Sequence, residues 1–434
     1  MRSVDHMKLS FWHDTTARGG GSKTFFRLAE ELAGMGHEVG FLSTAAFPSW
    51  YPLKVDFHQL EDDLIPQGES QQVVISHLTQ IPRVWRRNPS ARLLLLCLGY
   101  EGYSRAQHRG QVYQDVPVLH DLLNLGVEAA AYSSSVQRAL VERGCVCHLF
   151  SWALEAELFP LQPQAKPAET ARIAMIVDPA IPFKGFNDAL EALAGLKRPV
   201  ELHLLTRNLS WQPDGLEFPV VVHRTPERRD IAKILASCHL LLCSSWYEGL
   251  GRPALEAMAV GVPVVSTAHE GAENYARDGI NMLLAEVGDT AGLTSQMERV
   301  LSEPGLAQDL RQAGVASLEG HRSWTDSARG LVRVLERAEW CPRPEGVDWE
   351  QYLKRLKQAG LLFDQNERRE HHRVYQRIKR LANQEHSYQR SSELRVLEEN
   401  LREKAQSGDT TSLAQRDACR ILLNFPESRS FLNL

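Results

Sequence analysis

Residues 239–265 read HLLLCSSWYEGLGRPALEAMAVGVPVV, and the order of residue types indicates a strand, a tight turn and a helix. The apolar run HLLLCSS is typical of a strand buried in a parallel sheet. Gly249 and Gly251 allow the turn positive φ angles and close approach of other groups. Pro253 suits the first position of a helix that ends at Gly261. The start of such a helix presents free N–H groups and about half a positive charge, which predicts an anion site with phosphate as the common ligand.

Two glutamates flank this turn, Glu248 before it and Glu256 about one turn inside the helix. A carboxylate repels phosphate, so we expect both side chains to accept hydrogen bonds from hydroxyl groups. Sugars supply hydroxyls on both sides of the diphosphate in a nucleotide-sugar, and the residues therefore favour a nucleotide-sugar site. The alternative is that any doubly wound fold has such a turn, and that Glu256 is an ordinary acid in a first helical turn.

Alternating strand-like and helix-like segments extend outward from this stretch. RIAMIVD, VELHLLT and PVVVHR precede it, and PVVST and NMLLAEV continue it. An earlier series contains KLSFWHD, EVGFLST, VVISH and RLLLLCL, and the proline-rich residues 160–169 separate the two series. The alternation predicts an α/β fold with two Rossmann-like, doubly wound domains, residues 1–160 and 161–340. Ligands are expected in the cleft that the two domains face, at the carboxyl ends of the strands.

Residues 341–434 differ in composition from the two predicted domains. They are rich in Arg, Glu, Gln and His, and they contain few strand-forming residues. A broken apolar stripe that includes Val374, Ile378, Leu381 and Leu397 indicates helices. We therefore expect a C-terminal α-helical extension that packs on the body or on a partner, with homo-oligomerisation or acceptor contact as the sharper hypotheses.

Composition limits the classes of function. A chain of 434 residues with 43% hydrophobic and 24% charged residues is typical of a globular protein of two domains. The net charge of −5 argues against general nucleic-acid binding. No apolar run reaches the roughly 18–20 residues that a membrane span needs. Seven cysteines without an export signal predict free thiols in a cytoplasmic protein.

The segment from Glu248 has the pattern E-G-x-G-x-P-x-x-E-A-M-A-x-G-x-P-V-V, which resembles the E-x7-E signature of retaining glycosyltransferases of the GT-B fold, glycosyltransferase family 4. HEGAENYARDGINMLLAEVGD (269–289), SWALEAELFP (151–160) and GGGSKTFFRLAEELAGMGHEV (19–39) are similar to further segments of that family. The resemblance covers about residues 8–340. It implies transfer of a sugar, with retention of anomeric configuration, from a nucleoside diphosphate sugar to a glycan, glycolipid or protein acceptor.

The resemblance also implies roles for individual residues. Glu256 would hold the ribose hydroxyls, Glu248 would lie at the donor sugar, and Lys184 would neutralise the β-phosphate. Glu248 and Lys184 are therefore the catalytic candidates. Neither a metal ion nor a cofactor is expected, because a lysine and a helix start offset the diphosphate charge. The implied donor-binding set is Gly19, Gly20, Gly21, Lys184, Glu248, Gly249, Leu250, Gly251, Arg252 and Glu256.

Two departures from the family pattern concern the catalytic and acceptor sides. Relatives commonly have Gly-Arg ahead of the lysine, where this chain has Asp178 and Pro179; Arg252, or Arg18 or Lys23 across the cleft, is the expected replacement. Relatives often have a histidine after the strand that corresponds to RLLLLCL, where this chain reads LGYE. The acceptor-side candidates are Tyr100, Glu101 and His120.

Alternative functions and a membrane contact also follow from the sequence. Three alternatives to a transferase remain: a nucleotide-sugar epimerase of similar fold, a nucleotide-sugar-hydrolysing enzyme, and a non-catalytic nucleotide-sugar-binding partner subunit. In residues 81–92, Arg83, Trp85, Arg86 and Arg87 could dock an anionic membrane surface at the inner face of the membrane. The alternative for that stretch is a solvated helix face.

Overall fold

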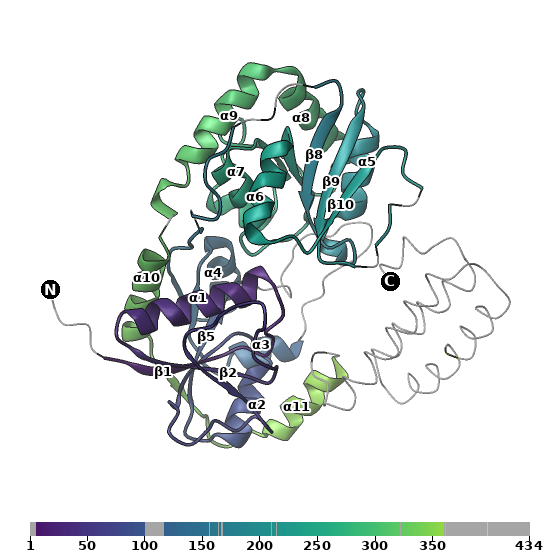
Figure 1. Ribbon diagram of the computed structural model, residues 1–434. Helices are drawn as coiled ribbons and strands as arrows, with labels where there is room; N and C mark the ends of the chain where they lie inside the picture. Colours follow the sequence, from purple (N-terminus) through teal and green to yellow (C-terminus); the bar gives the residue numbers. More distant parts are fainter. Residues whose placement is uncertain are drawn as a thin grey trace. The chain divides into compact units, whose positions relative to one another are not determined.

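The computed structural model contains two parallel sheets, each covered by helices (Figure 1). The structure describes residues 6–99, 117–155, 157–163, 165, 168–209, 211–213, 215–321, 323–359, 361 and 397. In the first sheet the strand order is β3-β2-β1-β4-β5-β6-β7. Its strands are β1 (Lys8–Trp12), β2 (Glu38–Ser43), β3 (Asp56–Gln59), β4 (Gln72–Ile75), β5 (Arg92–Cys97), β6 (Ala129–Ala131) and β7 (Cys147–Leu149). The helices of this half are α1 (Gly20–Gly34), α2 (Gln80–Arg87), α3 (Pro117–Leu123) and α4 (Ser134–Val141).

The second sheet has the order β10-β9-β8-β11-β12-β13, and its strands pair in parallel. Its strands are β8 (Ala171–Ile176), β9 (Val200–Thr206), β10 (Val220–Arg224), β11 (Leu240–Cys243), β12 (Val264–Thr267) and β13 (Leu283–Ala285). The helices that follow them are η2 (Pro182–Lys184), α5 (Phe186–Ala194), α6 (Arg228–Ser237), α7 (Arg252–Val260), η3 (Glu270–Asn274), α8 (Thr290–Ser302), α9 (Pro304–Ala316), η4 (Glu319–His321) and α10 (Trp324–Arg337). Strand order reverses beside β1 in one sheet and beside β8 in the other, so both are doubly wound and the predicted fold class is confirmed.

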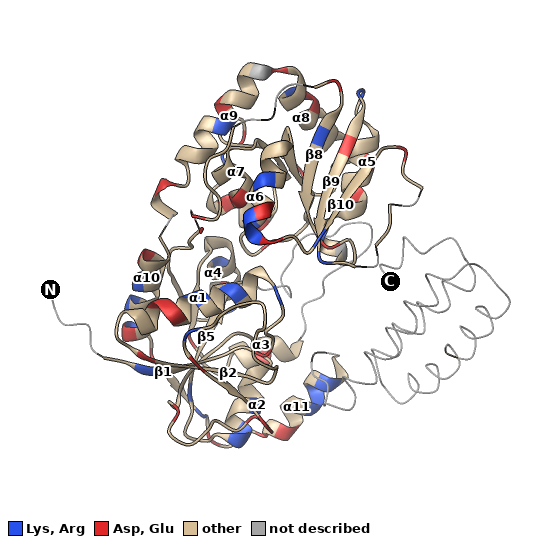
Figure 2. Cartoon of the chain, viewed as in Figure 1, with Lys and Arg blue, Asp and Glu red and all other residues tan. Residues whose placement is uncertain are grey.

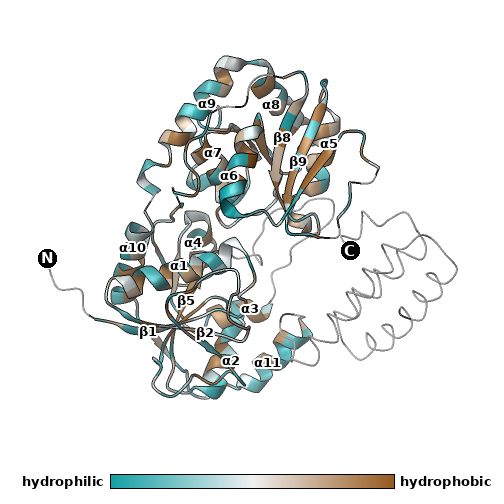
Figure 3. Cartoon of the chain, viewed as in Figure 1, coloured by the Kyte–Doolittle hydropathy of each residue, from teal (hydrophilic) through white to brown (hydrophobic). Residues whose placement is uncertain are grey.

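Apolar side chains point to both faces of the second sheet, and both faces are buried under helices. Ile173 and Met175 of β8 pack into the cluster that contains α5 and α8, whereas Ala174 faces the cluster that contains α7. The strands β8 and β9 are accordingly largely apolar in colour (Figure 3). A parallel sheet covered on both faces needs such continuous apolar strands, which is the pattern that the sequence showed.

The first half is completed by residues that follow the second half in the sequence. α10 packs against α1 (Figure 1). Between them, Thr325 Oγ1 donates a hydrogen bond of 2.9 Å to Glu31 Oε2. β14 (Cys341–Pro342) pairs antiparallel with β5. The two segments of chain that pass between the halves also meet, because the rings of Trp152 and His321 are stacked with centroids 3.7 Å apart.

The described residues 345–359 and 361 belong to a second compact unit, which also includes the first three residues of α3. Within this unit α11 (Trp349–Gln358) is described, and its N-cap Asp348 accepts a hydrogen bond from Gln351 N at 3.1 Å. Apart from Leu397, the predicted apolar stripe lies outside the described residues. The role of the helical extension in self-association therefore stays a prediction. Among the described residues, no helix combines the length and the apolar composition that a membrane crossing requires.

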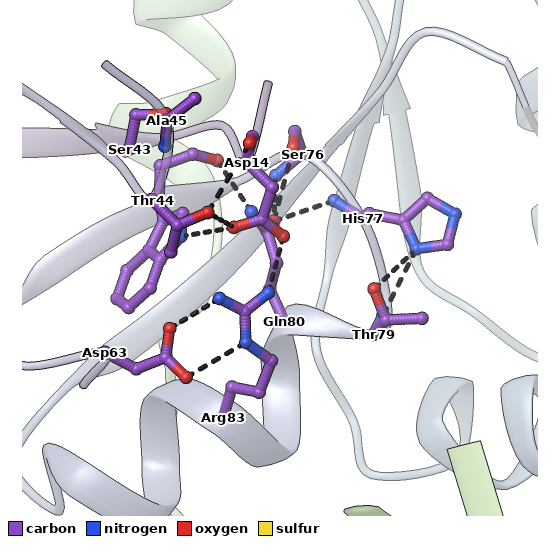
Figure 4. A network of polar contacts seen from close by, with 11 residues as sticks. Asp14, Ser43, Thr44, Ala45, Asp63, Ser76, His77, Thr79, Gln80 and Arg83 are labelled. Atoms are coloured by element: carbon purple, nitrogen blue, oxygen red, sulfur yellow. Dashed lines mark hydrogen bonds and ion pairs between the residues drawn. The ribbon is translucent and has the colours of Figure 1, made fainter. Parts of the chain in front are cut away.

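The expected membrane-facing stretch is largely interior. Trp85 has no exposed surface and donates to Ala91 O, and the Arg83 side chain is only 6% exposed. Figure 4 shows Arg83 between Asp14 and Asp63. Arg83 Nη1 lies 2.6 Å from Asp14 Oδ2, and Arg83 Nε lies 3.0 Å from Asp63 Oδ2. The membrane hypothesis was therefore wrong for Arg83 and Trp85, because two carboxylates and the core take up these side chains. Arg86 and Arg87 are exposed.

Replacing Arg83 with Ala should destabilise the first half by about 3–5 kcal/mol, because the change leaves two carboxylates without their cation. Thermal or urea unfolding would measure this loss. Arg86→Ala, an exposed arginine on the same helix, is the matched control and should change stability by less than about 0.5 kcal/mol. Equal stability of the two variants would contradict the assignment of Arg83 as the central cation of this network.

Candidate functional site

The strand order of the second sheet explains why two loops far apart in the sequence meet. β8 and β11 are neighbours where the order reverses, so the loops that follow them leave the same edge side by side. Lys184 is the last residue of η2 in the connection after β8, and Glu248 lies in the loop after β11. Lys184 Nζ is 2.8 Å from Glu248 Oε1, which also accepts a hydrogen bond of 2.8 Å from Ser245 Oγ. The two catalytic candidates are therefore in direct contact.

Glu248 is a largely buried carboxylate that is held in its ionised form. Its side chain is 14% exposed. Burial alone would raise the pKa of Glu248, but Lys184 and the Ser245 hydroxyl hold that pKa below its usual range. His269, which was not among the predicted site residues, is buried close by, and burial lowers its pKa to about 4. Its Nδ1 accepts from Ala272 N at 3.1 Å, so the neutral ring carries its proton on Nε2.

The turn before α7 has the backbone that its glycines require. Gly251 is the N-cap of α7 with φ of 88°, and Gly261 ends the helix with φ of 83°. The helix begins at Arg252, one residue earlier than expected, and Leu250 is buried beneath the turn. The first N–H groups of α7 therefore begin directly after the loop that carries Glu248, which is the arrangement expected of an anion site.

Gly249 lies directly against the first half. A Cβ on Gly249 would overlap Leu98 O and lie 2.9 Å from Gly99 Cα, just beyond the end of β5. The sequence departs here from the histidine expected after this strand. Because neither Gly249 nor Gly99 has a side chain, the backbones of the two halves can approach each other at the candidate site.

The glycine loop of the first half also reaches the second half. A Cβ on Gly19 would lie 3.2 Å from Arg207 Nη1, and a Cβ on Gly20 would lie 3.3 Å from Arg252 Cδ, whereas Gly21 faces open space. The structure therefore brings the loop to the first residue of α7. The replacement of the missing arginine by Arg252 stays a prediction.

The other two expected replacements are engaged in ion pairs. Arg18 Nη2 lies 3.0 Å from Glu227 Oε2 at the surface. Lys23 pairs with Glu155, and both side chains are buried. Burial lowers the pKa of Lys23 to about 8. Each of these cations already has an acidic partner, which leaves Arg252 as the stronger candidate.

Glu256 is buried, and its carboxylate meets an arginine. Arg228 Nη2 lies 2.9 Å from Glu256 Oε1 and 2.8 Å from Glu155 Oε2. Glu155 in turn pairs with Lys23 of α1, so four alternating charges run from the first half to Glu256. Neither Arg228 nor Glu155 was predicted as a site residue. Glu155 stands in SWALEAELFP, a segment similar to the family, but that similarity does not single out this side chain. Arg228 stands in a polar stretch that resembles exposed surface.

The acceptor-side candidates are only partly visible. Tyr100 and Glu101 lie outside the described residues, and His120 is half-buried in α3. In the place of the family's arginine segment, Asp178 Oδ1 accepts from Ala180 N at 3.0 Å and from Asn208 Nδ2 at 3.2 Å. Asp178 therefore organises its own loop. In the part of the chain that the structure describes, no cluster of His, Cys, Asp or Glu has the arrangement of a metal site.

Comparison with known proteins relates the second half to glycosyltransferases. Residues 160–316 match the family described as glycosyl transferases group 1. The MMP α-(1→4)-mannosyltransferase of Mycolicibacterium hassiacum is 32% identical over 204 residues, 44% of this chain and 48% of that protein. The lipopolysaccharide core biosynthesis glycosyltransferase LpsE of Rhizobium meliloti is 33% identical over 162 residues, 36% of this chain and 47% of that protein. The chain thus spans about half the length of these curated relatives.

Solved structures share the whole two-sheet arrangement at low sequence identity. Anabaena Alr3699/HepE in complex with UDP-glucose has a TM-score of 0.63 and 17% identity, over 77% of this chain and 100% of that one. Sucrose-phosphate synthase from Thermosynechococcus elongatus has a TM-score of 0.63 and 17% identity, over 76% and 99%. The described part of the chain therefore has the GT-B fold, and its second half is similar to the glycosyl transferases of group 1.

Proposed function

We propose that this protein is a retaining glycosyltransferase of family 4 that moves a sugar from a nucleoside diphosphate sugar to a glycan, glycolipid or protein acceptor in glycoconjugate biosynthesis. The observation that carries the proposal is the contact of Lys184 with Glu248 beside the start of α7. This contact lies in the half that matches the glycosyl transferases of group 1. The names of the mannosyltransferase and lipopolysaccharide relatives, and the UDP-glucose bound to a structural neighbour, support this donor and acceptor class.

Each charged group has a separate task in the proposed reaction. Lys184 and the N–H groups of α7 offset the charge of the leaving diphosphate. Glu256 accepts from the ribose hydroxyls, and Glu248 accepts from hydroxyls of the sugar. Bond breaking and attack occur on the same face of the sugar, and the leaving diphosphate takes the acceptor's proton. The protein then supplies position and charge rather than a nucleophile or a metal ion.

The stereochemistry of the product tests this proposal. UDP- and GDP-sugars are first screened by thermal shift, and donors that bind are then incubated with lipid-linked and soluble glycan acceptors. Proton NMR should show acceptor-dependent donor consumption and a product with the anomeric configuration of the donor. An inverted product would overturn the retaining assignment. Release of a free epimer without acceptor would favour the epimerase, and binding without turnover would favour the partner subunit.

A further inference from the structure

Arg228 occupies a position between the two halves of the protein. It is the first residue of α6, where basic and acidic residues lie close together (Figure 2). Its guanidinium lies over the ring of Phe159, 5.1 Å from the centroid, and Nη2 contacts Glu155. Phe159 and Glu155 both belong to the segment that connects the halves. The Arg228 side chain therefore contacts the connecting segment, although its backbone belongs to the second half.

The same Arg228 nitrogen contacts Glu256, and this contact determines how the Glu256 carboxylate is presented. Oε1 accepts from Arg228 at 2.9 Å, while Oε2 has no hydrogen-bond partner among the described residues. Glu256 is 4% exposed, so its carboxylate has few alternative positions. A guanidinium that fixes one oxygen of a carboxylate also fixes the direction in which the other oxygen accepts. The free oxygen is then directed to one place for a ribose hydroxyl.

The chain of charges continues into the first half through two further groups. Glu155 is 3% exposed, and burial would raise its pKa, but Arg228 and Lys23 hold that pKa below its usual range. Lys23 projects from α1, directly after the glycine loop. The charges of Lys23, Glu155, Arg228 and Glu256 alternate and sum to zero, so three of the groups can be buried beside the partly exposed Arg228. Removing one of them would leave an uncompensated charge on its neighbour.

We propose that Arg228 is a positioning residue that orients Glu256 toward the ribose, and that Glu155 of the connecting segment, paired with Lys23 of the first half, holds Arg228 in place. Recognition of the ribose thereby depends on contact between the two halves. This inference rests on the proposed function, because it takes the ligand of Glu256 to be the ribose of a nucleotide-sugar. Arg228 acts through Glu256 and needs no contact with the phosphates.

The experiment compares nucleotides that differ only in a ribose hydroxyl. Calorimetry with UDP and GDP, and with their 2′-deoxy and 3′-deoxy forms, gives the discrimination between ribose and deoxyribose. The wild type should bind the ribose form more tightly, and Arg228→Ala should lose this preference as its affinity for the ribose form falls by roughly 10- to 100-fold, the equivalent of one charged hydrogen bond. In Glu256→Gln protein, adding Arg228→Ala should cause little further loss.

Two more variants keep the result interpretable. Arg229→Ala removes the adjacent exposed arginine of α6 and should leave discrimination unchanged. Arg228→Gln covers the case in which the alanine variant does not fold. It should lose most of the discrimination, because its amide is uncharged and shorter than the guanidinium group whose Nη2 contacts both carboxylates. Wild-type discrimination in Arg228→Gln protein would overturn the proposal.

The remaining outcomes separate this proposal from the proposed function. If Arg228→Ala protein loses affinity equally for ribose and deoxyribose nucleotides, Arg228 acts on the phosphates. If the losses from Glu256→Gln and Arg228→Ala multiply in the double variant, Arg228 acts independently of Glu256. Either result would overturn this inference but leave the proposed function standing. If wild-type protein binds the ribose and deoxyribose nucleotides equally well, Glu256 does not recognise the ribose. That result would contradict this part of the proposed function and would also overturn the inference.

Discussion

Lys184→Ala protein should transfer sugar about 10²- to 10³-fold more slowly than the wild type at saturating donor, the range seen when one preorganised charge-stabilising group is removed from an active site. Lys184 is the cation in direct contact with Glu248, at the edge of the sheet where α7 begins. In the proposed reaction its ammonium offsets the charge that grows on the diphosphate as the sugar bond breaks, so the loss should fall mainly on kcat.

The same substitution should change the ionisation of Glu248. Burial raises the pKa of Glu248, and Lys184 is the first group that opposes it. Without Lys184 the carboxylate should therefore bind a proton at higher pH, which would move the acid limb of the pH–rate profile upward. Lys233→Ala, which removes an exposed lysine paired with Asp230, is the control and should behave as the wild type. An unchanged kcat in Lys184→Ala protein would refute the assignment of Lys184.

Gly249→Ala should lower kcat by about 10²-fold or more, because displacement of a catalytic element by about 1 Å costs that much. The new methyl group would overlap Leu98 O and press on Gly99 Cα. Both are backbone atoms that cannot rotate aside, so either the turn or the contact between the halves must shift. Glu248 precedes the turn and would move with it.

Separate measurements of turnover, donor affinity and unfolding would show which of these properties Gly249→Ala impairs. We expect a large loss of kcat, a smaller loss of donor affinity and a modest loss of thermal stability. Gly34→Ala is the control, since a Cβ at that helical position meets open space, and it should stabilise the protein by roughly 0.5–1 kcal/mol. A Gly249→Ala enzyme with normal kcat would show that the contact with β5 is not needed for turnover.

Much of the fold could be predicted from the sequence because local patterns determine it. Apolar runs alternating with amphipathic segments were sufficient for two doubly wound halves. Pro253 placed the start of α7 to within one residue, and Gly261 placed its end. The return of α10 to α1 was not predictable, because an amphipathic helix does not specify which apolar surface it will cover. That choice depends on how the chain is arranged in three dimensions.

Some residues of the candidate site could likewise be predicted from the sequence, and others could not. Lys184, Glu248 and the glycine turn could be found because they sit in contiguous motifs. The contact of Arg228 with Glu256 joins separate motifs, and nothing near Arg228 in the sequence distinguishes it from the exposed Arg229. Arg83 was misplaced for a related reason: an arginine beside a tryptophan looks like a surface patch until its two carboxylate partners, Asp14 and Asp63, are known.

The return of α10 and β14 to the first half has a consequence for the order in which the protein is made. Residues 171–302 form β8 to α8 without interruption, so the second sheet can assemble from one contiguous piece of chain. The first half lacks α10 and β14 until the ribosome has delivered that entire piece, and its contacts span long separations in sequence, which slows folding. Synthesis from the N-terminus therefore begins with the half that is completed last.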